Sequence, residues 1–201
     1  MPRRLRLRGI SLSIAYYNNL CYNIDKKCSQ IKLNNFKSML KKEETGITKF
    51  LSKEEIFIDY CDGTKKISDS KEIFDLCIDP HFNQEEMNQK SHPTKKTKIN
   101  VSEVVKNATL IQIFGSLDKN HDIDKLCLTQ HQISFFCRDH KYLLRGDTYG
   151  TLFLNKKGVH YYVFHVILLA GGLSIYRHHL GDSTIKWKGA CLHRVVTRCW
   201  L

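Results

Sequence analysis

The chain has 201 residues, so it is long enough to bury a hydrophobic core without disulfide bonds or structural metal ions. Apolar residues make up 42% of it, which argues against disorder of the whole chain. Its formal net charge of +12 favours negatively charged partners, such as nucleic acid, an anionic membrane surface or an acidic protein. The chain is also rich in Lys, Asn, Ile and Tyr, a bias that an AT-rich coding sequence produces. Composition bias is therefore an alternative explanation of the charge.

The N-terminal segment, MPRRLRLRGISLSIAYY, carries four arginines and a short apolar stretch that serines interrupt. No small-residue cleavage site follows, which argues against a secretory signal. Leu5 and Leu7 alternate with polar residues and the phase shifts near Gly9, which predicts a strand with a bulge over 5–14; an Arg-rich targeting segment is the alternative. The longest apolar run, 161–170, is shorter than the roughly 20 residues that cross a bilayer. We therefore expect no transmembrane segment and a cytoplasmic location.

The rest of the N-terminal half mixes helical and ambiguous patterns. A helix is predicted over 29–46, with Ser29 able to cap it and Gly46 able to end it. Residues 47–63 fit either a helix or a strand. A second, short helix is predicted over 68–79, before Pro80.

Residues 83–98 are polar and lysine-rich, contain Pro93, and have Met87 as their single apolar residue. This composition predicts a linker. The domain prediction is accordingly an N-terminal mixed α/β region at 1–82, the linker at 83–98, and a C-terminal α+β domain at 99–201.

The second half begins with a pattern typical of helices. Residues 100–117 predict one or two short helices. In the stretch LTQHQISFFCRDH (128–140), Thr129 and Gln132 have the spacing of a capping box. An apolar stripe follows at helical spacing, and we predict an amphipathic helix that buries Ile133, Phe136, Cys137 and His140 on one side.

After Gly150 the apolar period changes from about 3.6 to 2, which indicates strands. Glycine turns separate them, and the pattern predicts strands at 150–155, 159–169, 173–180, 184–188 and 191–200. The predicted fold class is α+β: a C-terminal helix packed on a four- or five-stranded antiparallel meander, with a mixed, mainly helical N-terminal part. The strand at 159–169 is apolar on both faces, so we expect the helix to cover one face and the first half of the chain or a partner to cover the other.

Several motifs of this half occur in the same order elsewhere. The stretches LTQHQI, YGTLFL, GGLSIYRHHL and HRVV, with Trp187 between the last two, resemble the C-terminal block of a group of small uncharacterised bacterial proteins, many from candidate phyla. That group reads L-T-x-x-Q-I, G-T-x-F-L and W…R-V-V. The resemblance covers residues 110–200 and implies a shared scaffold but no activity. The terminal TRCWL departs from the group, which often has a proline after the valines.

Cysteines and histidines are numerous, but their spacing argues against a metal or catalytic site. No two cysteines form C-x-x-C, and most lie at apolar positions, so we expect reduced, buried thiols rather than disulfides; they are Cys21, Cys28, Cys61, Cys77, Cys127, Cys137, Cys191 and Cys199. Zinc ligation by Cys127, His131, Cys137 and His140 would require the four to converge. A helix turns about 100° per residue, so it disperses them. We predict no metal ligand, no catalytic residue and no cofactor, and we leave enzymatic function open but less favoured.

Basic and aromatic residues alternate in the last strands, as in proteins that bind single-stranded nucleic acid. A solvated sheet face is the alternative interpretation. The predicted function is a small basic binding module that contacts nucleic acid through this basic and aromatic sheet face. An acidic protein is the other partner that the charge allows. The first alternative is a protein-interaction or homo-oligomerisation domain, and the second is a Cys/His enzyme or zinc site. The candidate nucleic-acid-binding residues are Arg3, Arg4, Arg6, Arg8, Arg177, Lys186, Lys188, Arg194, Arg198 and Trp200.

Overall fold

A computed structural model of the chain describes residues 46–51, 54–117, 122–147, 149–182 and 184–199. These residues all belong to one unit of the chain, Lys37–Leu201. The strand predicted at 5–14 and the body of the helix predicted over 29–46 lie outside them.

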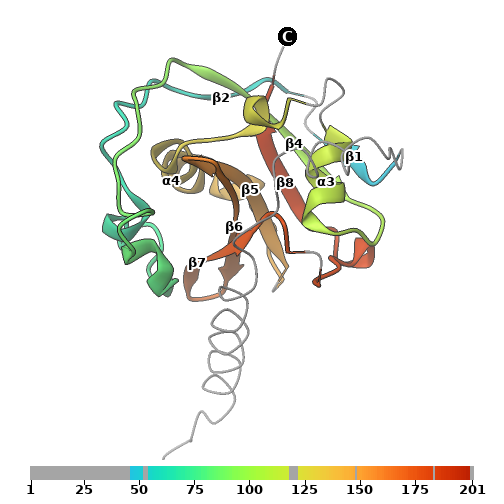
Figure 1. Cartoon of the computed structure of the whole chain (residues 1–201). Helices are drawn as coiled ribbons and strands as arrows, with labels where there is room; N and C mark the ends of the chain where they lie inside the picture. The colour runs from blue at the N-terminus through green and yellow to red at the C-terminus, as the bar shows by residue number, and fades with distance from the viewer. Residues whose placement is uncertain (1–45, 52–53, 118–121, 148, 183, 200–201) are drawn as a thin grey trace, which may run out of the picture. The chain divides into compact units, whose positions relative to one another are not determined.

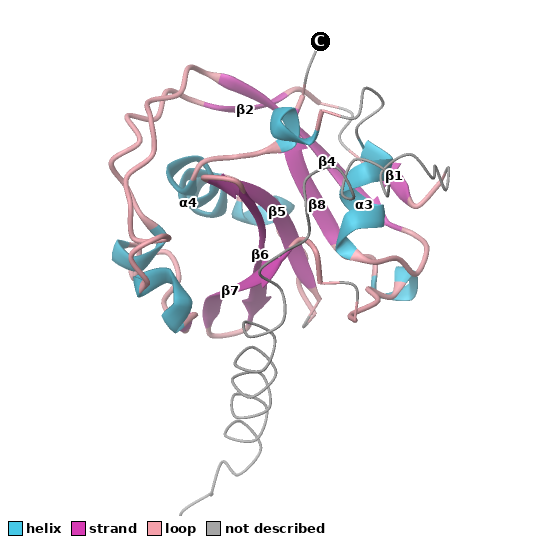
Figure 2. Ribbon diagram, in the orientation of Figure 1, coloured by secondary structure: helices cyan, strands magenta, loops and turns pink. Residues whose placement is uncertain are grey.

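The described residues form a mixed sheet of eight strands (Figures 1 and 2). Its order is β1-β4-β8-β5-β6-β7-β3, and β2 pairs with β4 beside β1. Strands β3 and β8 run parallel to β7 and β5, and the other pairs are antiparallel. The strands are β1 (Thr48–Phe50), β2 (Ile56–Ile58), β3 (Cys77–Ile78), β4 (Thr97–Val104), β5 (Gly150–Lys157), β6 (His160–Leu169), β7 (Gly172–His179) and β8 (Arg194–Arg198).

The predicted meander is present only in part. Strands β5, β6 and β7 follow one another as hairpins, and Gly158 supplies the positive φ of the first turn, +56°. The strand predicted at 184–188 is wrong, because Trp187 makes only an isolated bridge to Ala108. The last strand does not join β7 but crosses to the far edge of β5. A four- or five-stranded meander is therefore corrected to three strands within a larger mixed sheet. Strand β8 lies between β4 and β5, where both of its faces are buried. Two adjacent apolar residues, Val195 and Val196, fit this position because their side chains point to opposite faces.

Helix α4 (Gln130–Asp139) confirms the predicted capping box. The Gln132 N–H donates to Thr129 Oγ1 at 3.2 Å, and the Thr129 N–H donates to Gln132 Oε1 at 3.0 Å. The other α-helix of the described part is α3 (Leu110–Leu117), and no described helix is long and apolar enough to cross a bilayer. Short 3-10 helices are η1 (Ile67–Asp69), η2 (Pro80–Asn83), η3 (Ile123–Leu126), η4 (Lys141–Leu143) and η5 (Gly189–Cys191).

The main core lies between α4 and one face of the sheet. The rings of Phe136 on α4 and Phe153 on β5 meet edge to face, with centroids 5.5 Å apart. Phe82 of η2 meets Phe164 of β6 in the same way at 4.8 Å. Each phenylalanine buried in this manner stabilises the fold by about 1.5–3 kcal/mol. The core therefore fixes α4 over the middle of the sheet.

One predicted helix is wrong, and another is confirmed only in its second part. Residues 68–79 form the end of η1, a turn and the short strand β3, because carboxylates bind backbone amides of β7 instead of facing solvent: Asp75 accepts from the Leu173 N–H at 2.8 Å and Asp79 from the Arg177 N–H at 3.1 Å. The first part of 100–117 belongs to strand β4, which pairs with β8 from Ile99 to Glu103. The second part contains the predicted helix, as α3 (Leu110–Leu117).

Residues 83–98, predicted as a linker, contact the core of the described region. Met87 is 0% exposed, and its backbone carbonyl accepts a hydrogen bond from Gln130 Nε2 at 2.7 Å. Thr94 forms an isolated antiparallel β-bridge with Cys61, and strand β4 begins at Thr97. Strands on both sides of the segment lie in the same sheet.

Candidate functional site: a basic pocket at the start of α4

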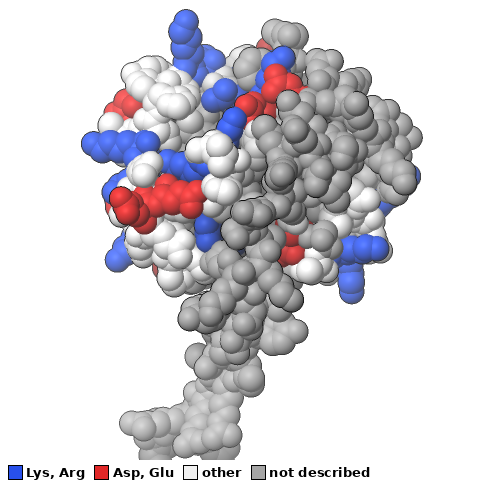
Figure 3. Space-filling model, viewed as in Figure 1, with Lys and Arg blue, Asp and Glu red and all other residues white. Residues whose placement is uncertain are grey.

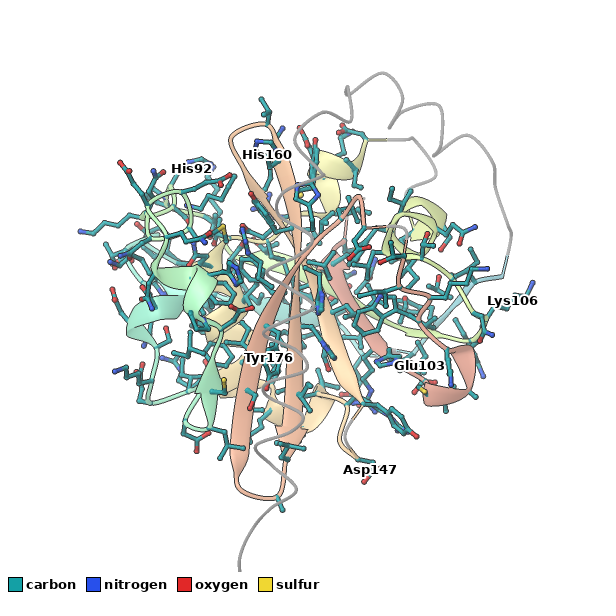
Figure 4. The ribbon with its side chains drawn as sticks, turned by 60° about the horizontal axis from the view of Figure 1, so that its bottom comes forward. His92, Glu103, Lys106, Asp147, His160 and Tyr176 are labelled. Carbon is teal, nitrogen blue, oxygen red and sulfur yellow. The ribbon has the colours of Figure 1, made fainter. Side chains whose placement is uncertain are left out.

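A pocket of about 510 Å³ lies beside the start of α4. Its walls come from residues 89–92, 127–129 and 155–158, together with Asp124 and Arg198. Figure 4 shows His92 of the first wall near His160, at the end of the sheet where the β5–β6 hairpin turns. Three segments that are distant in sequence therefore meet at this end of the sheet.

Backbone and amide hydrogen bonds hold the start of α4 against the end of β5. The Leu128 N–H donates to the Leu154 carbonyl at 2.8 Å, and Asn155 Nδ2 donates to the Leu128 carbonyl at 2.8 Å. The next residue, Thr129, caps α4. The positive end of the helix dipole consequently faces the pocket.

The charge of the pocket is predominantly positive. Lys90, Lys156, Lys157 and Arg198 line it, against one acidic lining residue, Asp124. Lys156 Nζ lies 2.6 Å from an Asp124 oxygen, so that pair is internally compensated.

Among the described residues, neither Lys157 nor Arg198 forms an ion pair of this kind. Lys157 Nζ donates to the Gln89 carbonyl at 3.1 Å, and Arg198 Nη2 donates to Gln132 Oε1 at 3.2 Å. Arg198 Nε is buried without a partner in the described part of the chain. Burial lowers the pKa of both side chains, since desolvation disfavours their charged forms. An anion in the pocket would offset that desolvation.

The structure separates the other predicted basic residues. Arg194 lies on the same sheet face as Arg198, but its Nη1 donates to the Leu144 carbonyl at 3.2 Å, beyond the opposite end of α4. Arg177 lies over the Tyr162 ring, 4.8 Å from its centroid. Lys186 and Lys188 are exposed on either side of the buried Trp187, and the remaining candidates, Arg3, Arg4, Arg6, Arg8 and Trp200, lie outside the described residues.

Figure 3 shows one face of the molecule, on which coloured Lys and Arg side chains stand apart and Asp and Glu side chains lie among them. On the coloured part of this face there is no continuous basic stripe.

The thiols and imidazoles of α4 each have their own surroundings. His131 Nδ1 accepts the Gly63 N–H at 3.2 Å, and His140 Nε2 lies 3.0 Å from the Phe57 carbonyl oxygen. Burial raises the pKa of Cys127 to about 12 and raises that of the fully buried Cys137 further. Neither is a reactive thiolate at neutral pH. Within the described ranges, no three His, Cys, Asp or Glu side chains are arranged to hold a metal ion, and the six described cysteines are free.

Sequence reasoning missed a cluster of three histidines around Trp187, on the sheet face opposite Phe164. Ring centroids of His165, His178 and His193 lie 4.8, 5.6 and 4.9 Å from that of Trp187. In Figure 4, Tyr176 marks this face on β7; its ring centroid is 6.4 Å from that of His165. Period-2 alternation placed His165 and His178 on strands, but only the strand order brings His193 beside them.

The three imidazoles are neutral at physiological pH. Burial lowers the pKa of His178 to about 4 and lowers those of His165 and His193 as well. Gly150 makes room for this packing, because a Cβ at that position would lie 1.9 Å from His165 Nε2. Its N–H donates to His193 Nδ1 at 3.2 Å. The cluster is therefore uncharged, and four of its buried nitrogens have no hydrogen-bond partner among the described residues: His165 Nδ1 and Nε2, His178 Nε2 and Trp187 Nε1.

No protein-family model, no curated protein and no solved structure matches the chain. The resemblance of residues 110–200 to uncharacterised bacterial proteins stays a prediction.

Proposed function

We propose that this chain is a binding module for single-stranded nucleic acid and that the basic pocket holds part of the phosphate backbone. The observation that carries the proposal is the meeting of Lys90, Lys157 and Arg198, from three distant segments, around one pocket at a helix N-terminus. The formal net charge of +12 acts in the same direction over longer distances. Backbone phosphates would supply an anion for Lys157 and Arg198, whose burial disfavours their charged forms.

Binding of this kind releases counterions, so its affinity falls as salt rises. The test is fluorescence anisotropy with a labelled single-stranded RNA, repeated between about 50 and 200 mM salt. We expect the logarithm of the association constant to fall linearly with the logarithm of the salt concentration.

Charge-matched variants locate the contact. Lys90→Gln/Lys157→Gln removes two pocket cations, and we expect the salt slope to decrease in magnitude by about 1.4, or about 0.7 for each lost phosphate contact. Lys49→Gln/Lys71→Gln removes the same charge from exposed positions that do not line the pocket, and we expect it to keep the wild-type slope. Lys186→Gln/Lys188→Gln tests the exposed lysines of the original prediction in the same way.

Absence of binding at the lowest salt would overturn the proposal. An equal reduction of the slope in the pocket variant and in the Lys49/Lys71 control would also overturn it. Phosphate contacts would then be spread over the surface and would not be located in the pocket.

A further inference from the structure

One uncharged residue of the pocket lining has a hydrogen-bond acceptor that the described residues leave unused. The Asn155 side chain is 2% exposed and lines the pocket, and its Oδ1 has no hydrogen-bond partner among the described residues. The Nδ2 atom donates to the Leu128 carbonyl at 2.8 Å. This bond fixes the orientation of the amide, since a flipped amide would bring two carbonyl-type oxygens together. A donor from outside the described residues, such as a ligand hydroxyl, would satisfy Oδ1.

An anion alone does not meet that need. A fully ionised phosphate group only accepts hydrogen bonds, so it suits Lys157 and the Nε donor of Arg198 but not Asn155 Oδ1. A hydroxyl group both donates and accepts, and the ribose 2′-hydroxyl is such a group beside a phosphate. The volume of about 510 Å³ lies within the range of about 300–1,000 Å³ that small-molecule pockets occupy.

We propose that the pocket binds a phosphate monoester on a hydroxyl-bearing sugar, as at the 5′-phosphorylated end of an RNA strand, with Lys157 and Arg198 on the phosphate and Asn155 Oδ1 accepting from the hydroxyl. A terminal monoester fits these cations better than an internal diester, since it carries a charge of about −1.5 to −2 at pH 7. The inference rests on the proposed nucleic-acid function for its macromolecular ligand. The same chemistry occurs in a free sugar phosphate, which is the second source.

The experiment compares three 3′-labelled strands of one sequence: RNA with a 5′-phosphate, RNA with a 5′-hydroxyl, and DNA with a 5′-phosphate. We expect the first to bind at least about tenfold more tightly than the second, as one charge-assisted contact provides. We also expect it to bind more tightly than the DNA, whose terminal sugar lacks the 2′-hydroxyl. Arg198→Lys keeps the charge but loses the guanidinium Nε donor, and we expect it to reduce the preference for the 5′-phosphate. Lys157→Gln provides a second variant at a more accessible position, and Lys49→Gln is the control that keeps the preference.

Ribose 5-phosphate separates the two sources. Competition against the phosphorylated RNA supports the pocket as the shared site. If no strand binds at low salt, the proposed nucleic-acid function fails. In that case a rise in melting temperature with ribose 5-phosphate, seen in the wild type and reduced in Lys157→Gln, supports the free sugar phosphate as the ligand.

Two results overturn the inference while leaving nucleic-acid binding intact. One is equal, salt-dependent affinity for the phosphorylated and unphosphorylated RNA. The other is equal affinity for phosphorylated RNA and DNA, which removes the role given to Asn155. If no strand binds and ribose 5-phosphate leaves the melting temperature unchanged, both proposals fall.

Discussion

Gln130 joins three segments of the core through its side chain, which is 0% exposed. Its Oε1 accepts the Ile67 N–H at 2.9 Å, and its Nε2 donates to the Met87 carbonyl at 2.7 Å. Gln130→Ala removes both bonds and leaves both backbone groups buried without a partner. Each such group costs about 1–3 kcal/mol, so we expect the free energy of unfolding to fall by about 2–6 kcal/mol. That is a large part of the 5–15 kcal/mol typical of a folded domain.

Urea unfolding followed by circular dichroism, with linear extrapolation to water, measures this loss. Gln89→Ala is the matched control, because the Gln89 side chain is exposed and only its backbone carbonyl is bonded; we expect a change within about 0.5 kcal/mol. Gln130→Glu keeps the volume and the acceptor but turns an oxygen toward the Met87 carbonyl, so it should also be destabilising at pH 7. A Gln130→Ala protein within about 0.5 kcal/mol of the wild type would refute the reasoning.

Acidification should destabilise the fold, because the unfolded chain binds protons below pH 6.5 that the folded His178, with its pKa of about 4, does not bind. His178 alone accounts for about 2 kcal/mol between pH 7 and pH 5, measured by urea unfolding, and equal stability at the two pH values contradicts this assignment. Gly150→Ala should cost about 1–3 kcal/mol because its Cβ would meet His165 Nε2; a neutral effect in the same assay argues against the packing described. Thr129→Ala should cost about 1 kcal/mol and Thr129→Ser much less, and equal losses would show that the hydroxyl is not the cap. Cys137 should resist alkylation at pH 8 until the chain unfolds, by mass spectrometry, and rapid labelling of the native protein would disprove its burial.

Features set by neighbouring residues were predictable from the sequence. The capping box of Thr129 and Gln132 needs a spacing of three residues, and the first hairpin turn needs the positive φ of Gly158. Both devices act within a few residues. Strands β5, β6 and β7 were found for the same reason, since their alternation is a local pattern.

Features set by distant partners were not predictable. Residues 97–104 have apolar positions at both helical and strand spacing, and only pairing with β8 decides between them. The polar composition of 83–98 concealed Met87, whose burial depends on contacts far along the chain.

The candidate site shows the same division. Its cations were visible in the sequence as scattered lysines and arginines, and Arg198 was among the predicted residues. Nothing local relates Lys90 to Lys157 or to Arg198, because they meet only when β5, β8 and the start of α4 are assembled. The histidine cluster needs the strand order for the same reason.

The central place of β8 has a consequence for how the protein folds as it is synthesised. Among the described strands, β4, with β1 and β2 on its edge, is linked to the β5–β6–β7 hairpins in the sheet through residues 194–198. In a nascent chain whose residues 194–198 are still inside the ribosome, the edges of β4 and β5 that pair with β8 are left open. Because exposed edges of this kind favour pairing with other chains, the interval before β8 emerges is when the nascent protein is most open to aggregation and to capture by chaperones.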